Sequence, residues 1–396
     1  MTADAGKALE GLKVLDVTQV MAGPFCAMQL CDMGADVIKV EPPEGDSTRR
    51  MSGAKGTDSP SFNAVNRGKR GIVLDLKRPA AQDAFRRLAA RSDVLIENYR
   101  PGVMKSFGLD AVSLCAMHPP LIYVSISGYG QTGPYAQKGG FDLVAQGVSG
   151  LMSVTGEPGG PPVKSGVPIT DLGAGLFALA AVLAALHHRD RTGCGQHIDT
   201  SLVEAGLALS VWEAAEYFSE QVTPQAQGSA HRFLAPYQAI RCSDGYITIG
   251  AGTDRLFAAL CDLLGHGDWT SEEAFATAVA RVRNRAALID RIEAITSRHT
   301  RGHWLEQLDA RAIPCGPINT FAEAFADPQT KARAMIAELD HPTLGRIPTL
   351  GSPIKMSETP PVVGAHVPRL GEHTREVLGE AGLTESEIDT VCERVR

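Results

Sequence analysis

Apolar runs alternate with segments of helical spacing over the N-terminal third of the chain. The runs predict strands over Lys13–Val17, Asp36–Val40, Gly71–Leu76, Asp93–Ile96 and Leu121–Ile126. Helical spacing follows Pro24, which suits the first turn of a helix ending near Gly34, and recurs over Ala80–Arg91. Repeated strand–helix–strand units with short connections predict an α/β fold with a doubly wound parallel sheet.

A long helix marks the middle of the chain. Asp171–His188 has helical spacing and contains the longest apolar run, Leu172–Leu186, which is shorter than the about 20 residues of a membrane-spanning helix. We therefore predict a buried core helix here. A strand over His197–Asp199 and a helix over Ser201–Phe218 follow, and the polar residues 219–232 predict a linker.

The rest of the chain predicts a smaller α+β unit and a return segment. Tyr237–Arg241 and Tyr246–Ile249 flank a Ser-Asp-Gly turn, as in a β-hairpin, and helical spacing then continues over 255–325. The last segment is rich in Pro and Gly, with one helix predicted after Gly371. The predicted organisation is a large domain over 1–218, a linker and small domain over 219–330, and a return to the large domain over 331–396.

Composition and charge narrow the class of protein. The 396 residues are 44% hydrophobic and 21% charged, with a net charge of −7, as in an ordinary globular protein. A mildly acidic chain without a basic run argues against nucleic acid or a membrane as partner. The residues before Leu12 lack the apolar stretch of a secretion signal, and the 8 cysteines form no CxxC pair. We therefore expect a cytoplasmic enzyme with reduced cysteines.

Two motifs do not lead to a cofactor or a metal. Gly128–Gly133 (GYGQTG) fits the dinucleotide pattern GxGxxG, but Pro134 and polar residues follow it instead of an apolar helix. We therefore expect no nicotinamide or flavin dinucleotide. His299 and His303 are four residues apart but lack an accompanying Cys or carboxylate set, so no metal site is expected.

Asp171 opens the most apolar helix of the chain, directly after Pro168-Ile169-Thr170. A helix N-terminus favours an acidic residue, so one interpretation is a cap or first-turn acid. The other is a carboxylate nucleophile that the helix dipole keeps ionised and that the small residues Gly173, Ala174 and Gly175 let a substrate approach. Spacing alone leaves both interpretations open.

Several motifs occur in the order found in one known family. They are Leu15–Pro24 (LDVTQVMAGP), Gly34–Glu41 (GADVIKVE), Asn66–Arg70 (NRGKR), Glu97–Gly102 (ENYRPG), Ser127–Pro134 (SGYGQTGP), Arg191–Gln196 (RTGCGQ) and Ile313–Pro317 (IPCGP). With these motifs the chain resembles the class III CoA-transferases (CaiB/BaiF, formyl-CoA transferase type) over most of its length. The resemblance implies a Rossmann-like large domain built from both chain ends, a small domain, and an interlocked homodimer.

The resemblance also implies roles for individual residues. The family's nucleophile begins the helix before the RTGxGQ turn, a position that Asp171 occupies here. A CoA thioester and a carboxylic acid are then the substrates, with no tightly bound cofactor. The family's CoA contacts correspond to Val20, Met21, Ala22, Leu74, Asn98, Tyr99, Arg100 and Val103. Nearby cations that can meet the CoA phosphates are Lys39, Lys69, Arg70, Lys105 and Lys138.

Departures from the family pattern bear on the reaction. Members that use oxalate have a Gln where Met21 stands and a Tyr-Glu pair where Phe141-Asp142 stands, which argues against an oxalate activity. The α-methylacyl-CoA racemases, the main alternative, have a His in place of Phe141, and a Phe cannot move a proton. A CoA-thioester hydrolase is a further alternative, because water can attack an acyl group carried on Asp171.

The substrate pocket is expected to draw on the middle of the chain. The glycine-rich active-site loop of oxalate-using members corresponds to Gly228–Arg232, where this sequence has one glycine, Gly228. We therefore expect a stiffer cover in which His231 or Arg232 contacts the substrate. A substrate with a second carboxylate needs a cation beside Asp171, and we expect a short dicarboxylate such as succinate. The candidate cations are Arg49, Arg50, Arg100 and Arg232.

Overall fold

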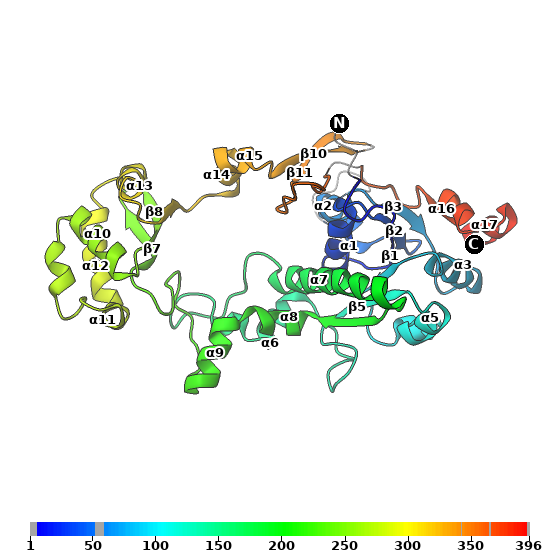
Figure 1. Cartoon of the computed structure of the whole chain (residues 1–396), viewed down its shortest axis with the longest axis horizontal. Coiled ribbons are helices and arrows are strands. Elements are labelled where there is room, and N and C mark those ends of the chain that lie inside the picture. Colours follow the sequence, from blue (N-terminus) through cyan, green and yellow to red (C-terminus); the bar gives the residue numbers. More distant parts are fainter. Residues whose placement is uncertain (1–5, 52–58, 342, 364–365, 394–396) are drawn as a thin grey trace. The chain divides into compact units, whose positions relative to one another are not determined.

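The computed structural model describes residues 6–51, 59–341, 343–363 and 366–393. They form two compact units, whose elements are labelled in Figure 1. The larger unit takes in the chain up to Leu151, Lys164–Ser219 and the chain from Pro328 onward, and the smaller unit takes in Met152–Val163 and Glu220–Asp327. The prediction from the sequence put the domain boundaries after residues 218 and 330. It did not assign residues 152–163 to the small domain.

A 6-stranded parallel sheet forms the centre of the larger unit, in the order β3-β2-β1-β4-β5-β6. β1 pairs with β2 on one side and β4 on the other, so that Val14 lies between Val37 and Val94. The winding of the chain reverses at this point, where an α/β sheet opens a crevice at the carboxyl ends of its strands. The predicted parallel, doubly wound sheet is confirmed. Its strands are β1 Lys13–Asp16, β2 Asp36–Glu41, β3 Arg70–Val73, β4 Val94–Glu97, β5 Ile122–Ser127 and β6 His197–Ser201.

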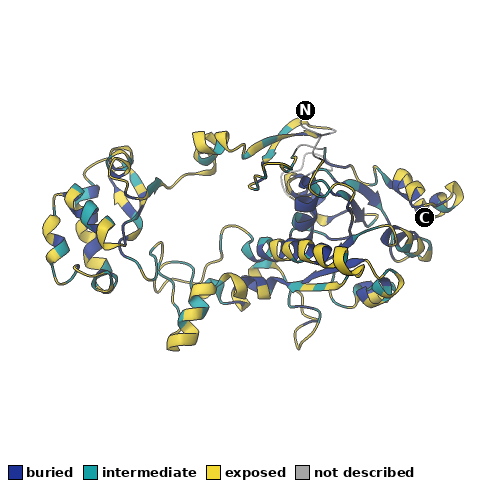
Figure 2. Ribbon diagram, in the orientation of Figure 1, coloured by how far each residue is buried: buried dark blue, intermediate teal, exposed yellow. Residues whose placement is uncertain are grey.

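Alternate strand residues pack into two separate cores, one on each face of the sheet. Ile96 and Val124 pack with α1 (Ala22–Asp32) and α7 (Ile169–Thr192) on one face. Leu95 packs on the other face, in the core that contains α3 (Pro79–Ala89). Figure 2 shows the buried residues concentrated on the sheet and on the facing sides of these helices. The other helices of this unit are η1 Ser47–Arg50, α2 Pro60–Asn66, α4 Val103–Ser106, α5 Ala111–Met117, α6 Asp142–Val148, α8 Leu202–Leu209, α9 Val211–Glu220, α15 Pro328–Ala332, α16 Thr374–Glu380 and α17 Glu385–Cys392. The short helix η2 (Leu151–Ser153) spans the chain boundary between the two units.

One face of α7 is buried and the other is exposed. Among the described residues α7 is the one helix long and apolar enough to cross a membrane, but 50% of its most apolar stretch is buried. Ala174, Ala178 and Val182 pack inside the larger unit, while Leu176 and Phe177 on the opposite side are 51% and 42% exposed. The predicted core helix is therefore correct for one face and wrong for the other.

The smaller unit combines a 3-stranded antiparallel sheet with short helices. Its first two strands, β7 (Tyr237–Cys242) and β8 (Gly245–Gly250), form the predicted hairpin. β9 (Cys315–Pro317) pairs with β8 and was not predicted, because so short a strand containing Gly and Pro has no alternating pattern. The helices are α10 Asp254–Leu264, η3 Gly267–Ser271, α11 Ala278–Arg283, α12 Arg285–Thr296, α13 Arg301–Asp309 and α14 Phe321–Ala326.

Other segments differ from the sequence-based prediction. The single helix expected over Ser201–Phe218 is interrupted at Ser210, whose ψ of 45° is not helical. After residue 331 the chain forms an antiparallel hairpin of β10 (Ile336–His341) and β11 (Gly345–Leu350), which the prolines of this segment obscured. Two helices, α16 and α17, follow Gly371 instead of one.

Candidate functional site

Asp171 lines a cavity of about 260 Å³ at the carboxyl edge of the parallel sheet. The walls come from the turns after β1 and β4, the loop after β5 and the first turn of α7. The cavity brings together eight residues that the sequence singled out and adds Gln19, which it did not. The eight are Val20, Met21, Ala22, Asn98, Tyr99, Arg100, Phe141 and Asp171.

The side chain of Asp171 is free of the capping role that one interpretation gave it. The cap residue of α7 is Pro168, which makes no side-chain cap bond, and no residue in the described parts of the chain hydrogen-bonds the Asp171 carboxylate. Instead, Oδ1 of Asp142 accepts hydrogen bonds from the Thr170 N–H at 3.0 Å and the Thr170 hydroxyl at 2.7 Å. Gln146 donates to its other oxygen at 2.7 Å. Asp142, expected to contact the substrate, therefore holds the start of α7.

Burial, followed by the charge of Asp142, raises the pKa of Asp171 to about 7. The expectation that the helix dipole keeps this group ionised is wrong near neutral pH, where protonated and ionised forms coexist. Burial disfavours the charged form because few groups solvate it. A carboxylate in this environment is a reactive nucleophile once it is ionised.

The glycines after Asp171 serve helix packing instead of the substrate access that we expected. A Cβ on Gly173 would lie 2.9 Å from Cδ1 of Leu209 in α8, and one on Gly175 would lie 2.7 Å from the carbonyl oxygen of Ala22 in α1. Because these positions lack a Cβ, α7 can approach both helices closely. The first residues of α1 thereby come beside Asp171.

The turn after β1 forms one wall of the cavity in an unusual conformation. Val20 has a φ of +71°, a region that costs a β-branched residue about 1–3 kcal/mol. Asn98 fixes the residue before it: Oδ1 accepts the Gln19 N–H at 2.9 Å and Nδ2 donates to the Gln19 carbonyl at 2.7 Å. The Asn98 side chain, expected to contact CoA, thus joins the turns after β1 and β4.

Ion pairs lie buried beneath this turn. Nζ of Lys39 lies 3.1 Å from Oδ2 of Asp46, and Nζ of Lys69 lies 2.8 Å from Oδ2 of Asp16, all four side chains being 0% exposed. Burial opposes these charges, but the lysines hold the pKa of both Asp16 and Asp46 below the ordinary range. The carboxylates likewise outweigh burial and raise the pKa of Lys39. Lys39 and Lys69 were expected to meet CoA phosphates, and this assignment is wrong because both are enclosed in the core.

Three further cations named from the sequence are also engaged elsewhere. Arg49 pairs with Glu41 at 2.7 Å, and Arg70 pairs with Asp36 at 2.6 Å. Arg50 donates to a backbone carbonyl outside the cavity. Arg49 and Arg50 are therefore not the cations for a substrate carboxylate, and Arg70 is not available to a CoA phosphate.

Arg100, Lys105 and Lys138 are exposed around the cavity. Arg100 lines the Asp171 cavity and also two smaller cavities beside it. Lys105 lines one of these smaller cavities, and Lys138 lines the other with its Nζ 3.6 Å from the centre of the Tyr135 ring. These three side chains place positive charge around the cavity.

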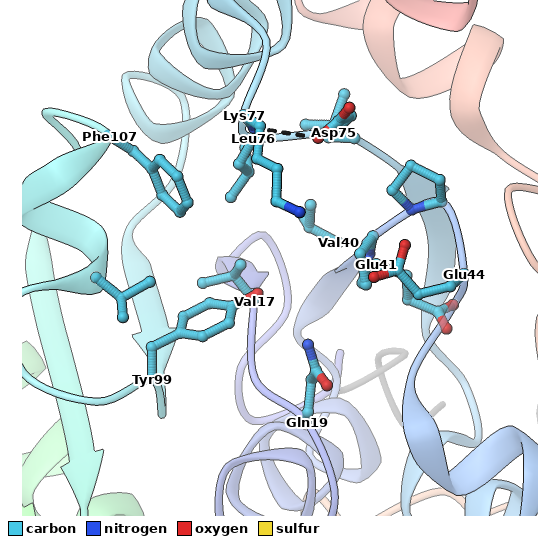
Figure 3. A pocket seen from close by; sticks show the side chains of 14 residues that line it. Val17, Gln19, Val40, Glu41, Glu44, Asp75, Leu76, Lys77, Tyr99 and Phe107 are labelled. Atoms are coloured by element: carbon cyan, nitrogen blue, oxygen red, sulfur yellow. Dashed lines mark hydrogen bonds between the residues drawn. The ribbon is translucent and has the colours of Figure 1, made fainter. Parts of the chain in front are cut away.

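A second cavity of about 320 Å³ adjoins the first, because Gln19 and Tyr99 line both. Figure 3 shows the Tyr99 and Phe107 rings on one side and the Lys77 side chain pointing into the space between them and Glu41. The cavity is thus partly apolar, and its lining contains two aromatic rings, one cation (Lys77) and three acidic residues (Glu41, Glu44 and Asp75).

Leu74 and Val103, both expected CoA contacts, also lie in the wall of the second cavity. Sequence reasoning missed Gln19, Lys77 and Phe107. One signal for Lys77 was available, since it directly follows the third predicted strand and so lies at the carboxyl edge of the sheet.

The predicted cover residues Gly228, His231 and Arg232 lie in the smaller unit. Gly228 has a φ of +60°, which favours glycine. The His231 ring packs edge-on against Tyr237 at 4.9 Å, and Arg232 donates to the Gln225 carbonyl at 3.1 Å. Their contact with a substrate stays a prediction.

The two adjoining cavities suit an extended ligand whose reactive carbonyl lies beside a buried carboxylate. Residues 9–374 of the chain match the family described as CoA-transferase family III. The succinate–glutarate CoA-transferase of Agrobacterium fabrum is 40% identical over 94% of this chain and 95% of its own length. The human succinyl-CoA:glutarate CoA-transferase is 41% identical over 94% of this chain and 86% of its own.

A solved structure gives the same result for the fold. A CAIB/BAIF family protein from Brucella suis is 43% identical, and it matches 95% of this chain and 99% of that chain with a TM-score of 0.85. The residues matched to the family, 9–374, include the sheet, the turn before α1 and the start of α7, which are the elements that carry the site. The chain is therefore a CoA-transferase and belongs to CoA-transferase family III.

Proposed function

We propose that this enzyme moves CoA from succinyl-CoA to a short dicarboxylic acid through covalent intermediates on Asp171. The proposal rests on the Asp171 carboxylate, which is partly buried and accepts no hydrogen bond from the described residues. This carboxylate lines a cavity together with the turn after β1. The names of the similar proteins, which include succinate and glutarate, support the choice of donor and acceptor.

The proposed reaction has four steps. The Asp171 carboxylate attacks the donor thioester and gives a mixed anhydride and CoA thiolate. The thiolate attacks the Asp171 carbonyl of the anhydride, which releases succinate and leaves an aspartyl-CoA thioester. The acceptor carboxylate attacks this thioester and forms a second anhydride, and CoA thiolate then attacks the acceptor carbonyl to give the new thioester and free Asp171. Covalent catalysis thus divides one difficult exchange into easier steps.

Backbone N–H groups at the start of α1 are the proposed donors to the oxyanions. α1 begins at Ala22 without a side-chain cap among the described residues, so its first N–H groups have no acceptor within the helix. Ala22 lines the Asp171 cavity. Fixed N–H donors stabilise charge that develops on a carbonyl oxygen in the transition state.

The second cavity is the proposed place of the CoA nucleotide. The rings of Tyr99 and Phe107 suit stacking with adenine, and Lys77 suits a phosphate. The pantetheine arm then passes Gln19, which lines both cavities, and reaches Asp171. In this proposal CoA is a substrate, and the enzyme needs no tightly bound cofactor.

Arg100 is the proposed partner of the second carboxylate of the acceptor, because it is an exposed guanidinium in the wall of the Asp171 cavity. We expect Arg100→Ala to raise the KM for succinate and glutarate about 10- to 100-fold, the usual effect of losing one charge-assisted contact. The KM for butyrate, which has one carboxylate, should change less. Initial rates for acyl-CoA donors crossed with free acids, followed by chromatography of CoA esters, measure these values.

The matched control for Arg100 is Arg50→Ala, an exposed arginine outside the cavity, which should leave the ranking of acids unchanged. The dicarboxylate proposal fails if monocarboxylic or aromatic acids exceed every dicarboxylate with the unaltered enzyme. Product that appears as free CoA and free acid in the absence of an acceptor would instead favour the hydrolase.

Activity should depend on pH through Asp171. Its pKa is about 7 in the free enzyme, and only the ionised form attacks, so kcat/KM should rise about tenfold per pH unit below pH 7 and level off above it. Asp142→Asn removes the charge that helps to raise this pKa while its amide oxygen can still accept from Thr170. The acidic limb should therefore move to lower pH in this variant, and an unchanged limb would refute the assignment.

We also propose that a second copy of the chain covers exposed apolar side chains on α7, α8 and α9, as in the homodimer that the family resemblance implies. Leu176, Leu207 and Phe218 are 51%, 54% and 75% exposed, and large exposed apolar side chains often mark a protein–protein interface. Leu176→Glu should weaken the dimer in sedimentation equilibrium. Val279→Glu, on an isolated exposed residue of α11, should leave it intact, and a monomeric unaltered protein would refute the proposal.

The proposed compartment is the cytoplasm. The 8 cysteines of the chain are all free thiols in the structure. Free thiols are typical of a reducing compartment, and this supports the proposal.

A further inference from the structure

The buried charges beneath the turn after β1 have no part in the four steps above, yet they contact the turn directly. Asp46 lies before η1 and its side chain is 0% exposed. Its Oδ1 accepts from the Thr48 N–H at 2.9 Å, which caps η1. Its Oδ2 faces the other way, 3.1 Å from Nζ of Lys39 and 3.3 Å from the N–H of Val20. One carboxylate therefore joins a buried lysine to the residue with positive φ in the cavity wall.

Lys39 contacts the same turn from below. Its Nζ donates to the carbonyl oxygen of Thr18 at 2.8 Å, while its charge pairs with Asp46. The turn is thus held at both ends, by an acceptor for the Val20 N–H and a donor for the Thr18 carbonyl. Because valine does not adopt a φ of +71° by preference, surrounding contacts must impose this conformation.

We propose that Asp46 is a positioning residue for CoA transfer: by accepting the Val20 N–H inside a buried ion pair, it imposes the conformation in which Met21 and Ala22 face Asp171. This inference rests on the proposed role of Asp171 and adds a residue that does not touch the substrate. The geometry supports it because Val20, Met21, Ala22 and Asp171 line one cavity. An uncharged acceptor would hold Val20 less firmly, since the bond to a carboxylate is the stronger one.

Asp46→Asn tests the proposal with little change of shape. The amide oxygen can still accept from Thr48, but the amide nitrogen then faces two donors, Lys39 and the Val20 N–H. Rapid mixing of the full-length enzyme with succinyl-CoA, followed by quenching and mass spectrometry, gives the rate constant of adduct formation on Asp171. We expect this rate constant to fall about 10- to 100-fold, with a smaller change in the KM for succinyl-CoA. A single-turnover rate constant does not depend on the fraction of enzyme that is folded.

Asp32→Asn is the matched control. Asp32 is the last residue of α1, and its carboxylate makes an equally buried ion pair with Arg67 at 2.6 Å, with exposures of 4% and 3%. It does not contact the turn. We expect Asp32→Asn to lower the melting temperature as Asp46→Asn does and to leave the rate constant within about threefold. Equal rate constants for the two variants would show that Asp46 is merely structural.

Val20→Gly provides a second test, whose result differs between a positioning role and a purely structural role of Asp46. Glycine adopts a positive φ without strain, so the turn needs less support in this background. Asp46→Asn should then reduce the rate constant by less than about threefold in the Val20→Gly enzyme. If the two substitutions act independently, Asp46 does not work through Val20 and the inference is overturned.

Failure of this inference differs from failure of the proposed function. If the unaltered enzyme forms no adduct on Asp171, the proposed mechanism fails and Asp46 has nothing to position. If the adduct forms and Asp46→Asn forms it as fast as Asp32→Asn does, the mechanism stands and the positioning role is wrong.

Discussion

Replacing Asp171 with Asn is expected to reduce CoA transfer by about 10⁴-fold or more, because an amide cannot form the anhydride on which the reaction depends. The same substitution should make the folded protein more stable at pH 8. The folded-state pKa of Asp171, about 7, lies above its ordinary value of 3.8, so the ionised group destabilises the fold above pH 7. By linkage the gain is at most about 4 kcal/mol.

The gain in stability should depend on pH. Below pH 3.8 the carboxyl group is protonated in both the folded and the unfolded chain, so the advantage of Asn should vanish there. Urea unfolding at pH 4 and pH 8 measures the difference. Asp190→Asn, on an exposed residue of the same helix, is the control and should change neither activity nor stability. A variant at Asp171 that retains turnover would remove the nucleophile from the mechanism.

The second large effect is expected in the buried core, where Lys69→Met should destabilise the larger unit by about 3–5 kcal/mol. Nζ of Lys69 donates to Asp16 at 2.8 Å, to the Pro24 carbonyl at 3.0 Å and to Asn66 at 2.9 Å. Methionine fills a similar volume but leaves three buried acceptors without this donor. The midpoint of urea unfolding, followed by circular dichroism, gives the loss.

Two further variants show whether the loss of stability comes from the buried ion pair. Lys13→Met, on an exposed lysine of β1, should change stability by less than about 0.5 kcal/mol. Adding Asp16→Asn to Lys69→Met removes the charge left behind, and it should restore part of the loss. A loss below about 1 kcal/mol for Lys69→Met would mean that water or a neighbouring group compensates this charge.

The parallel sheet was predictable because local patterns determine it. Each strand is a short apolar run, and its order along the chain with intervening helices restricts the sheet to few topologies. The hairpin of β10 and β11 was missed for a local reason too, since Pro348 lies within β11 and prolines argue against a strand. Residue propensity and periodicity thus predict regular apolar strands, but they miss a strand that contains proline.

The state of individual charged residues was not predictable in the same way. Lys39 lies within an apolar strand, and the sequence does not show that Asp46 returns to pair with it inside the core. Asp142 caps a helix that begins many residues later in the chain, which leaves Asp171 without that task. The burial of Lys39 and the capping by Asp142 both depend on tertiary contacts. The spacing of apolar residues in the sequence indicates only which residues share a face of one helix or strand.

Trapping of the covalent intermediate tests the central claim most directly. The enzyme is mixed with succinyl-CoA without an acceptor, treated with borohydride or hydroxylamine, digested and analysed by mass spectrometry. The mechanism predicts that the side chain of Asp171 is converted to the alcohol or the hydroxamate, and that neither product forms when succinate and free CoA replace the thioester. An unmodified Asp171 in an enzyme that transfers CoA once an acceptor acid is added would contradict the account.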